Sequence, residues 1–266
     1  MARDSAHEFS DAEIRAFERE AAGVYGEAGK TAHTNLKRYL AQFEADDEKM
    51  RERLEAGEIT KAQYRSWRSG KIAAGRRYRI VLKQCAEAMT HANTVAAAAI
   101  EGRLPEVYAE NYNYGTWQAY SAAGVDDAFA LQDASTVQGL LTDHGSYLPK
   151  PSVNVAKDTA WNRRLIANQI TQGILLGESI PKIARRMQDV TGTNRAAAVR
   201  LARTSVTAAE NAGRVDSYKR AKGLGIDLKQ EWLATLDLRT RSSHRKLDGE
   251  KVEVGGKFSN GCRYPG

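Results

Sequence analysis

Apolar residues recur every three to four positions along most of the chain, which is the spacing of amphipathic helices. The first hundred residues are expected to form three helical segments, at 10–29, 31–56 and 60–100. Ser10 and Glu13 have the spacing of a capping box, and Thr60 is a suitable N-cap for the third segment. Gly23, Gly26 and Gly29 are expected to end the first segment, and Ser69-Gly70 to interrupt the third.

The composition of the chain changes at residues 102–105, and a linker that contains Gly and Pro follows at 142–157. After this linker, apolar residues again recur at helical spacing. We expect helices at 158–176 and 179–190, followed by a long helix from Thr193 or Asn194 to Gly223. The inner face of this long helix is built almost entirely from small residues, which let a neighbouring helix approach closely. Its members are Val199, Ala202, Val206, Ala209 and Gly213.

A small α+β region is expected at the end of the sequence. Residues 231–236 and 251–254 have the β-branched and aromatic content of short strands. Because two short strands bury little apolar area, we expect Trp232 to anchor this region on the long helix. The predicted fold class is therefore mainly α, with long antiparallel helices and a small C-terminal α+β subdomain. The predicted domains are 1–150, 151–228 and 229–266.

The most polar face in the sequence is predicted between those two strands. Asp237 is a suitable N-cap for a short helix from Leu238, and Gly249 suits a left-handed C-terminal cap. The polar positions at spacings of four, three and four are Asp237, Arg241, His244 and Asp248. A general acid-base set or a metal-dependent hydrolase centred on His244 is one interpretation, and capping with salt bridging explains the same residues without catalysis. Cys262 and His244 supply only part of a zinc ligand set, so no metal is expected.

Basic residues are concentrated in one segment. The whole chain has a net charge of +7, but residues 61–83 hold eight Lys and Arg and no acid. Such a segment could contact phosphates, and it could equally be a solvated helix face opposite the acidic residues 44–58. The candidate DNA-binding residues are Arg65, Arg68, Lys71, Arg76, Arg77 and Arg79. No apolar run approaches the roughly 18 residues of a membrane span, and two cysteines give no disulfide framework, so we expect a chain that stays inside a cell or a particle assembled there.

An ordered series of motifs covers the second half of the chain. Residues 202–214 read Ala-Arg-Thr-Ser-Val-Thr-Ala-Ala-Glu-Asn-Ala-Gly-Arg, residues 232–249 run from Trp-Leu-Ala-Thr-Leu-Asp to Lys-Leu-Asp-Gly, and Phe258-Ser-Asn-Gly and Tyr264-Pro-Gly follow. This order resembles the minor head proteins of tailed bacteriophages, the head morphogenesis family of Mu F type. The matching motif residues are Arg203, Thr204, Glu210, Asn211, Arg214, Trp232, Asp237, Arg239, Arg241, His244, Asp248 and Gly249.

The resemblance implies a minor capsid protein that acts by binding, in the capsid interior or at the portal vertex, after assembly in the host cytoplasm. It implies the portal protein and other capsid subunits as partners, contact with packaged double-stranded DNA, no cofactor and no membrane. Family members usually continue into a tail with further cysteines, so a complete thiolate site is not expected from this chain alone. The run Arg203-Thr204-Ser205, followed by Glu210, is also compatible with a nucleotide-transferring enzyme. Such enzymes need strands and a shaped cleft around these residues, whereas here a single alanine-rich helix is predicted, so we do not expect this activity. A stand-alone DNA-binding protein and the hydrolase remain the alternatives.

Overall fold

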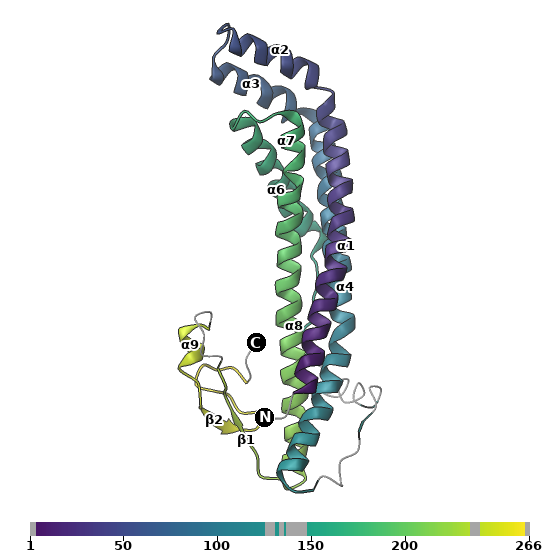
Figure 1. Ribbon diagram of the computed structural model, residues 1–266, viewed down its shortest axis with the longest axis vertical. Helices are drawn as coiled ribbons and strands as arrows, with labels where there is room; N and C mark the ends of the chain where they lie inside the picture. The colour runs from purple at the N-terminus through teal and green to yellow at the C-terminus, as the bar shows by residue number, and fades with distance from the viewer. Residues whose placement is uncertain (1–3, 126–130, 133–135, 137–147, 235–239, 264–266) are drawn as a thin grey trace. The chain divides into compact units, whose positions relative to one another are not determined.

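The computed structural model describes residues 4–125, 131–132, 136, 148–234 and 240–263. Helices dominate it, with one two-stranded antiparallel sheet near the end of the described chain, which confirms the mainly α fold class (Figure 1). The elements are α1 Ser5–Ala41, α2 Glu44–Glu55, α3 Lys61–Ile72, α4 Gly75–Ala122, α6 Val155–Leu175, α7 Ile180–Arg185, α8 Met187–Gly223, β1 Lys229–Glu231, α9 Ser242–Arg245 and β2 Lys251–Glu253.

The chain forms two compact units, each assembled from separated stretches. Unit 1 consists of Met1–Phe17, Ala99–Pro151 and Arg200–Gly266, and unit 2 of Glu18–Ala98 and Ser152–Val199. The helices α1, α4 and α8 contribute residues to both units. The division of the chain at residues 150 and 228 stays a prediction. Among the described residues, none of the helices combines the length and apolar character that a membrane span requires.

Unit 2 has one large apolar core, to which its long helices and α6 and α7 all contribute. Two hydrogen bonds show that α1 and α4 are antiparallel in it, because the Tyr25 hydroxyl donates to Asn93, whereas the Ala32 carbonyl accepts from Cys85. Tyr39, further along α1, donates to the carbonyl of Ile72 at the end of α3. The core side chains include Leu36, Leu40, Met89, Ile166, Ile170, Ile174, Ile183 and Val190. Burial raises the pKa of the Cys85 thiol to about 12, so this residue is an inert part of the core.

The first helix differs from the prediction, because α1 runs without a break through Gly23, Gly26 and Gly29. Each helical glycine costs only about 1 kcal/mol relative to alanine, and the buried face continues past the glycines from Tyr25 to Leu36. Ser10 is not the N-cap either, since its hydroxyl donates to the Ala6 carbonyl within the helix, at 3.0 Å. The capping side chain is Asp4, whose Oδ1 accepts the His7 N–H at 3.0 Å.

The predicted start of α3 is confirmed, and the predicted interruption at Ser69-Gly70 lies a few residues later, at residues 73–74 between α3 and α4. Thr60 Oγ1 accepts the Gln63 N–H at 3.2 Å, and Gln63 Oε1 accepts the Thr60 N–H at 2.8 Å, which is a complete capping box. The helix passes Gly70 and ends at Ile72. Helix α4 also continues through Pro105, where the sequence suggested a break. Buried residues on both sides, from Ile100 to Tyr108, continue the apolar face and outweigh the roughly 3 kcal/mol cost of a helical proline.

The second half of the chain follows the predicted helices more closely. Helix α6 ends just before Gly177, whose φ of +68° is the left-handed conformation expected of a terminating glycine. Helix α7 is shorter than expected, and α8 already begins at Met187. Thr193 and Asn194 therefore lie inside α8, where each side chain donates to the carbonyl four residues earlier. Burial of Met187 and Val190 favours this earlier start.

The C-terminal sheet pairs Lys229 with Glu253, Gln230 with Val252 and Glu231 with Lys251. The second strand agrees with the prediction, whereas β1 lies earlier than residues 231–236, of which 235–236 fall outside the described residues. Trp232 is 2% exposed and packs on Leu247 and Phe258, with ring centroids of Trp232 and Phe258 5.0 Å apart. Trp232 thus forms the core of this small region itself, whereas we expected it to anchor the region on the long helix.

Candidate functional site

The motif of residues 202–214 lies on α8 and faces α4 across an unusually close contact. A Cβ atom on Gly213 would lie 2.4 Å from the Tyr108 carbonyl oxygen and 2.9 Å from the Tyr112 nitrogen. The predicted stripe of small residues is confirmed as a packing face, with Ala202, Val206 and Ala209 all buried. The motif therefore fixes the distance between two helix backbones in unit 1.

Arg214 is the centre of a polar network in unit 1. Its Nε donates to Asn111 Oδ1 at 2.9 Å, and its Nη2 donates to Asp4 at 2.8 Å. The guanidinium also lies 5.2 Å from the centre of the Tyr114 ring, in a cation–π contact. Asn111 is fully buried and donates in turn to Ser10 Oγ at 2.9 Å. Arg214 thereby ties the N-terminus of α1 and the face of α4 to α8.

Glu210 completes this Arg214 network one turn earlier on α8. Its Oε1 lies 2.9 Å from His7 Nδ1 and 3.5 Å from Arg214 Nη2. Burial lowers the pKa of His7, but the hydrogen bond and charge of Glu210, with Asp11 and Asp4, raise it by more, so the net shift is upward. Asp4 and His7 were missed in the sequence because they lie some two hundred positions from their partners, and no periodicity connects residues so far apart.

The remaining motif residues of α8 have different surroundings. Arg203 and Thr204 are exposed, and Asn211 Nδ2 donates to the Thr207 carbonyl at 2.8 Å within the helix. Arg203 and Glu210 lie seven residues apart on the same helix. Glu210 is paired with His7 and Arg214. The described residues around them form helices, not the strand-lined cleft that nucleotide transfer would require.

The C-terminal motif does not form the predicted polar helix face. Helix α9 covers only Ser242–Arg245, and Arg241 is its N-cap residue, with ψ at 142°. Asp248 lies in the turn after the helix and accepts the Ala234 N–H at 2.9 Å, while the Gly249 N–H donates to the Trp232 carbonyl at 2.9 Å. These bonds close the turn onto the segment of Trp232, which shortens the helix. Asp237 and Arg239 lie outside the described residues.

His244 is half-buried and packs against the aromatic core of this region. Its ring meets the Trp232 ring edge-on, with centroids 5.5 Å apart and an angle of 88°. Cys262 is exposed, and its carbonyl accepts the Phe258 N–H. Within the described part of the chain, no cluster of three or more His, Cys, Asp or Glu residues could hold a metal ion. The predicted left-handed cap is present, because Gly249 has a φ of +79°.

The basic segment is divided between the core and the surface of unit 2. Arg68 is 0% exposed, its Nε lies 2.9 Å from Asp47 Oδ1, and its Nη2 donates to the Glu178 carbonyl at 2.6 Å. Arg68 is therefore structural and unavailable to a phosphate. The other candidate side chains are exposed: Arg65, Lys71, Arg76, Arg77 and Arg79.

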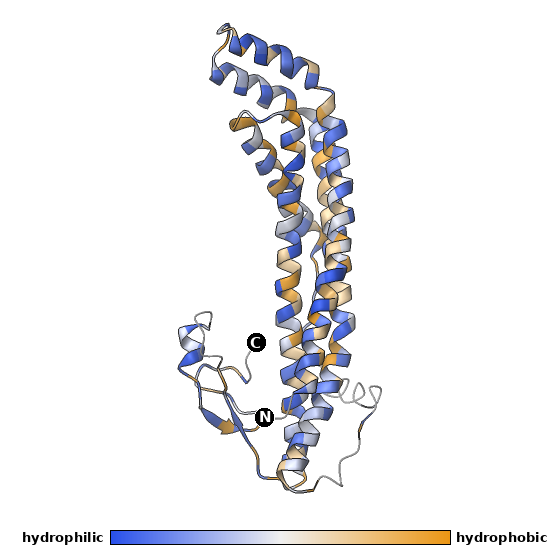
Figure 2. Ribbon diagram, in the orientation of Figure 1, coloured by the Kyte–Doolittle hydropathy of each residue, from blue (hydrophilic) through white to orange (hydrophobic). Residues whose placement is uncertain are grey.

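The acidic helix α2 and the basic helix α3 lie side by side, as the hairpin interpretation expected (Figure 1). Figure 2 shows both helices dominated by hydrophilic residues. The two helices are joined through charge at one buried cluster. In it, Asp47 of α2 pairs with Arg68 of α3, and the Tyr64 hydroxyl lies 2.8 Å from Asp47 Oδ1. Tyr64 and Tyr78 are buried, so of the aromatic residues in this segment only Trp67 is partly accessible.

Comparison with known proteins finds a family model that covers the motifs of α8 and of the Trp232 region. Residues 164–266 match the sequence model of the family described as Phage Mu protein F like protein. The chain is 29% identical over 157 residues to the minor head protein GP7 of Bacillus phage SPP1, which covers 59% of this chain and 50% of that protein. Residues 164–266 are therefore similar to the Phage Mu protein F like family, and the resemblance stated from the motifs is confirmed.

A second relative carries a different name. The chain is 37% identical over 94 residues to the NAD(+)–arginine ADP-ribosyltransferase EFV of Enterococcus faecalis, which covers 35% of this chain and 19% of that protein. The chain thus spans half or less of the curated relatives it matches. No solved structure matches the chain.

Proposed function

We propose that this chain is a minor capsid protein that takes part in head morphogenesis of a tailed bacteriophage. The match of residues 164–266 to the Mu F-like family is the observation that carries the proposal. The relative in phage SPP1 that is named a minor head protein supports it over a longer stretch. The family motif residues described in α8 and around Trp232 serve helix packing, ion pairing and turn closure, which suits a protein that acts by binding.

The proposed partners are the portal protein and other capsid subunits, in the virion and, before that, in the procapsid assembled in the host cytoplasm. Exposed motif residues on α8, among them Arg203 and Thr204, are the first candidates for such contacts. Packaged double-stranded DNA is a further proposed partner, through the exposed Arg65, Lys71, Arg76, Arg77 and Arg79. A stand-alone DNA-binding role is the second candidate, and this cationic surface is the observation that favours it.

We propose that the chain is not an enzyme. The Enterococcus relative named for ADP-ribosyl transfer shares only 19% of its length with this chain, and that activity belongs to that protein. Here Glu210 is held by His7 and Arg214, and His244 packs on Trp232. Incubation of the purified chain with NAD⁺ and an arginine analogue should release no nicotinamide. Release that depends on Glu210 would contradict a purely structural role.

An early stop codon in this chain's reading frame, within the phage that carries it, tests the assembly role. Loss of infectious particles, restored by the chain supplied in trans, is the expected result. Cross-linking of purified particles should then join the chain to the portal protein or to capsid subunits, identified by mass spectrometry. Particles that form and infect normally without the chain would overturn the proposal.

A further inference from the structure

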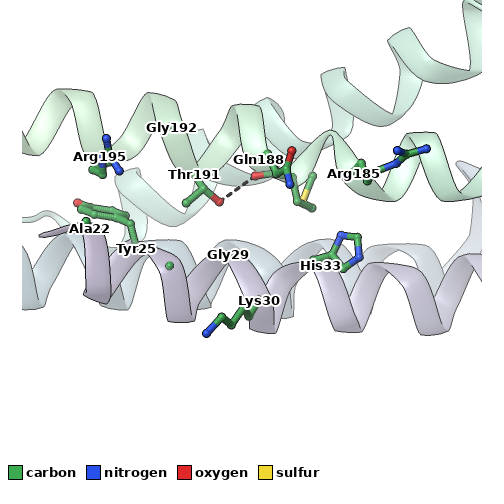
Figure 3. A pocket seen from close by; sticks show the side chains of 12 residues that line it. Ala22, Tyr25, Gly29, Lys30, His33, Arg185, Gln188, Thr191, Gly192 and Arg195 are labelled. Carbon is green, nitrogen blue, oxygen red and sulfur yellow. Dashed lines mark hydrogen bonds between the residues drawn. The ribbon is translucent and has the colours of Figure 1, made fainter.

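A groove of about 590 Å³ lies in unit 2, between α1 and the beginning of α8 (Figure 3). Its lining includes the buried side chains of Tyr25 and Met187. Two glycines that line it, Gly26 and Gly192, have open space where a Cβ would be. At Gly29, by contrast, there is no room for a side chain, since a Cβ there would lie 2.8 Å from Thr191 Oγ1 of α8.

The charged groups around this groove are mostly cationic. Arg195 lies near one end and Arg185 near the other, with Gln188 and Thr191 between them (Figure 3). No acidic residue is among the described residues that line the groove. Lys30 points away from α8 and is paired with Glu27, with Nζ 2.7 Å from Oε1, so it adds little to the charge inside. Arg185 and Arg195 are therefore the cationic groups at the two ends of the groove.

His33 adds a directional polar group to the same groove. Its Nδ1 lies 3.0 Å from the Ala184 carbonyl oxygen, and because a carbonyl only accepts, Nδ1 must carry the proton of this hydrogen bond. In the neutral ring, Nε2 is then a hydrogen-bond acceptor. The groove thus offers an apolar floor, two guanidinium groups and a fixed imidazole.

We propose that this groove binds an acidic helical segment of a partner protein. Guanidinium groups form bidentate, charge-assisted pairs with carboxylates, and Ala or Leu side chains of the same segment would cover Tyr25 and Met187. Gln188 and Arg195 lie seven residues apart on α8, about 10 Å, so a segment of two to three helical turns spans the groove. Duplex DNA offers phosphates but no apolar side chains for this floor, so it fits less well. The inference depends on the groove alone and stands independently of the role in head assembly.

Fluorescence anisotropy on the purified full chain tests the proposal. The probe is a labelled 18-residue helical peptide of Glu, Ala and Leu, and its counterpart has Lys in place of Glu. We expect the acidic peptide to bind and the basic one not to bind. The double variant Arg185→Glu/Arg195→Glu should bind at least tenfold more weakly. The matched control, Arg163→Glu/Arg164→Glu, makes the same charge change at exposed positions of α6 and should stay within twofold of the wild type.

A second variant tests the shape of the groove separately from its charge. Gly26→Leu adds a side chain to the open space of the groove without changing charge, and it should also weaken the acidic peptide at least tenfold while circular dichroism shows a folded chain. Equal loss in the Arg163/Arg164 control, or full binding by Gly26→Leu, would overturn the proposal. Competition by a 20-base-pair duplex that needs the same two arginines would also overturn it, because the occupant would then be DNA. Self-association that the same variants abolish would overturn it too, because the occupant would then be a second copy of the chain.

Discussion

Gly213 of α8 lies directly against the backbone of Tyr108 in α4, where a Cβ would stand 2.4 Å from the carbonyl oxygen. Gly213→Ala should therefore lower the free energy of unfolding by about 1–3 kcal/mol, since the clash is with backbone and cannot be relieved by a rotamer change. Gly23→Ala is the matched control in α1, where the new Cβ meets nothing within 4 Å. It should raise stability by about 0.5–1 kcal/mol, as expected of alanine in a helix interior. Thermal unfolding followed by circular dichroism measures both. Equal effects of the two variants would contradict the close packing.

Arg68 and Asp47 form a buried ion pair, and removing one partner should be costly. In Arg68→Met the Asp47 carboxylate stays buried, at 4% side-chain exposure, and its remaining partners among the described residues are Tyr64 and a more distant Arg51. We expect a loss of about 3–5 kcal/mol in the free energy of unfolding, measured in urea. Arg65→Met removes the same charge from the exposed side of α3 and should change stability by less than about 0.5 kcal/mol. An equally small change in both variants would contradict the burial of Arg68.

The stability of unit 1 should depend on pH through His7. Its pKa in the folded chain is raised above the ordinary value of 6.5, because Glu210 and nearby acids favour the imidazolium despite burial. The protonated form is therefore bound more tightly by the folded state. The resulting stabilisation is fully present below pH 6.5 and is lost as the pH rises through the higher folded pKa.

The comparison of wild type with His7→Gln between pH 5.5 and 8.5 checks this dependence. The stability difference between the two proteins should shrink as pH rises. NMR titration of the His7 ring gives its pKa directly, and the Glu210→Gln variant, which removes the charge, should bring it down. A His7 pKa below 6.5 in the wild type would show that burial outweighs the acids.

The sequence located those features whose cause lies within a few residues. The N-cap at Thr60, the end of α6 before Gly177 and the small face of α8 each depend on local chemistry, and all three are present. The sequence did not show that α1 continues through three glycines, because that depends on packing against other helices. It also missed the ties from Arg214 to Asp4 and Asn111, which join positions 210 and 103 residues apart.

Contacts between distant positions also explain why the candidate sites differ from their predictions. Spacing placed Asp237, Arg241, His244 and Asp248 on one helix, but burial of Trp232 and the bond from Ala234 to Asp248 turn the chain after Arg245. Charge counting grouped Arg68 with its neighbours in the basic segment, although that side chain is in the core. A pattern of residue types cannot distinguish a buried arginine from an exposed one when its acidic partner comes from another helix.

The proposed DNA contact makes a prediction about salt dependence. The variant Arg76→Glu/Arg77→Glu/Arg79→Glu removes three exposed cations at the start of α4. If each neutralises one phosphate, the slope of log affinity against log salt should become less steep by about 2.7, since each contact contributes about 0.9. The control Lys157→Glu/Arg163→Glu/Arg164→Glu makes the same change in net charge on α6 and should keep the wild-type slope. Filter binding of a 30-base-pair duplex between 50 and 200 mM salt gives both slopes. Should the two triple variants lose affinity equally, the attraction would come from net charge, and no DNA site would exist at the start of α4.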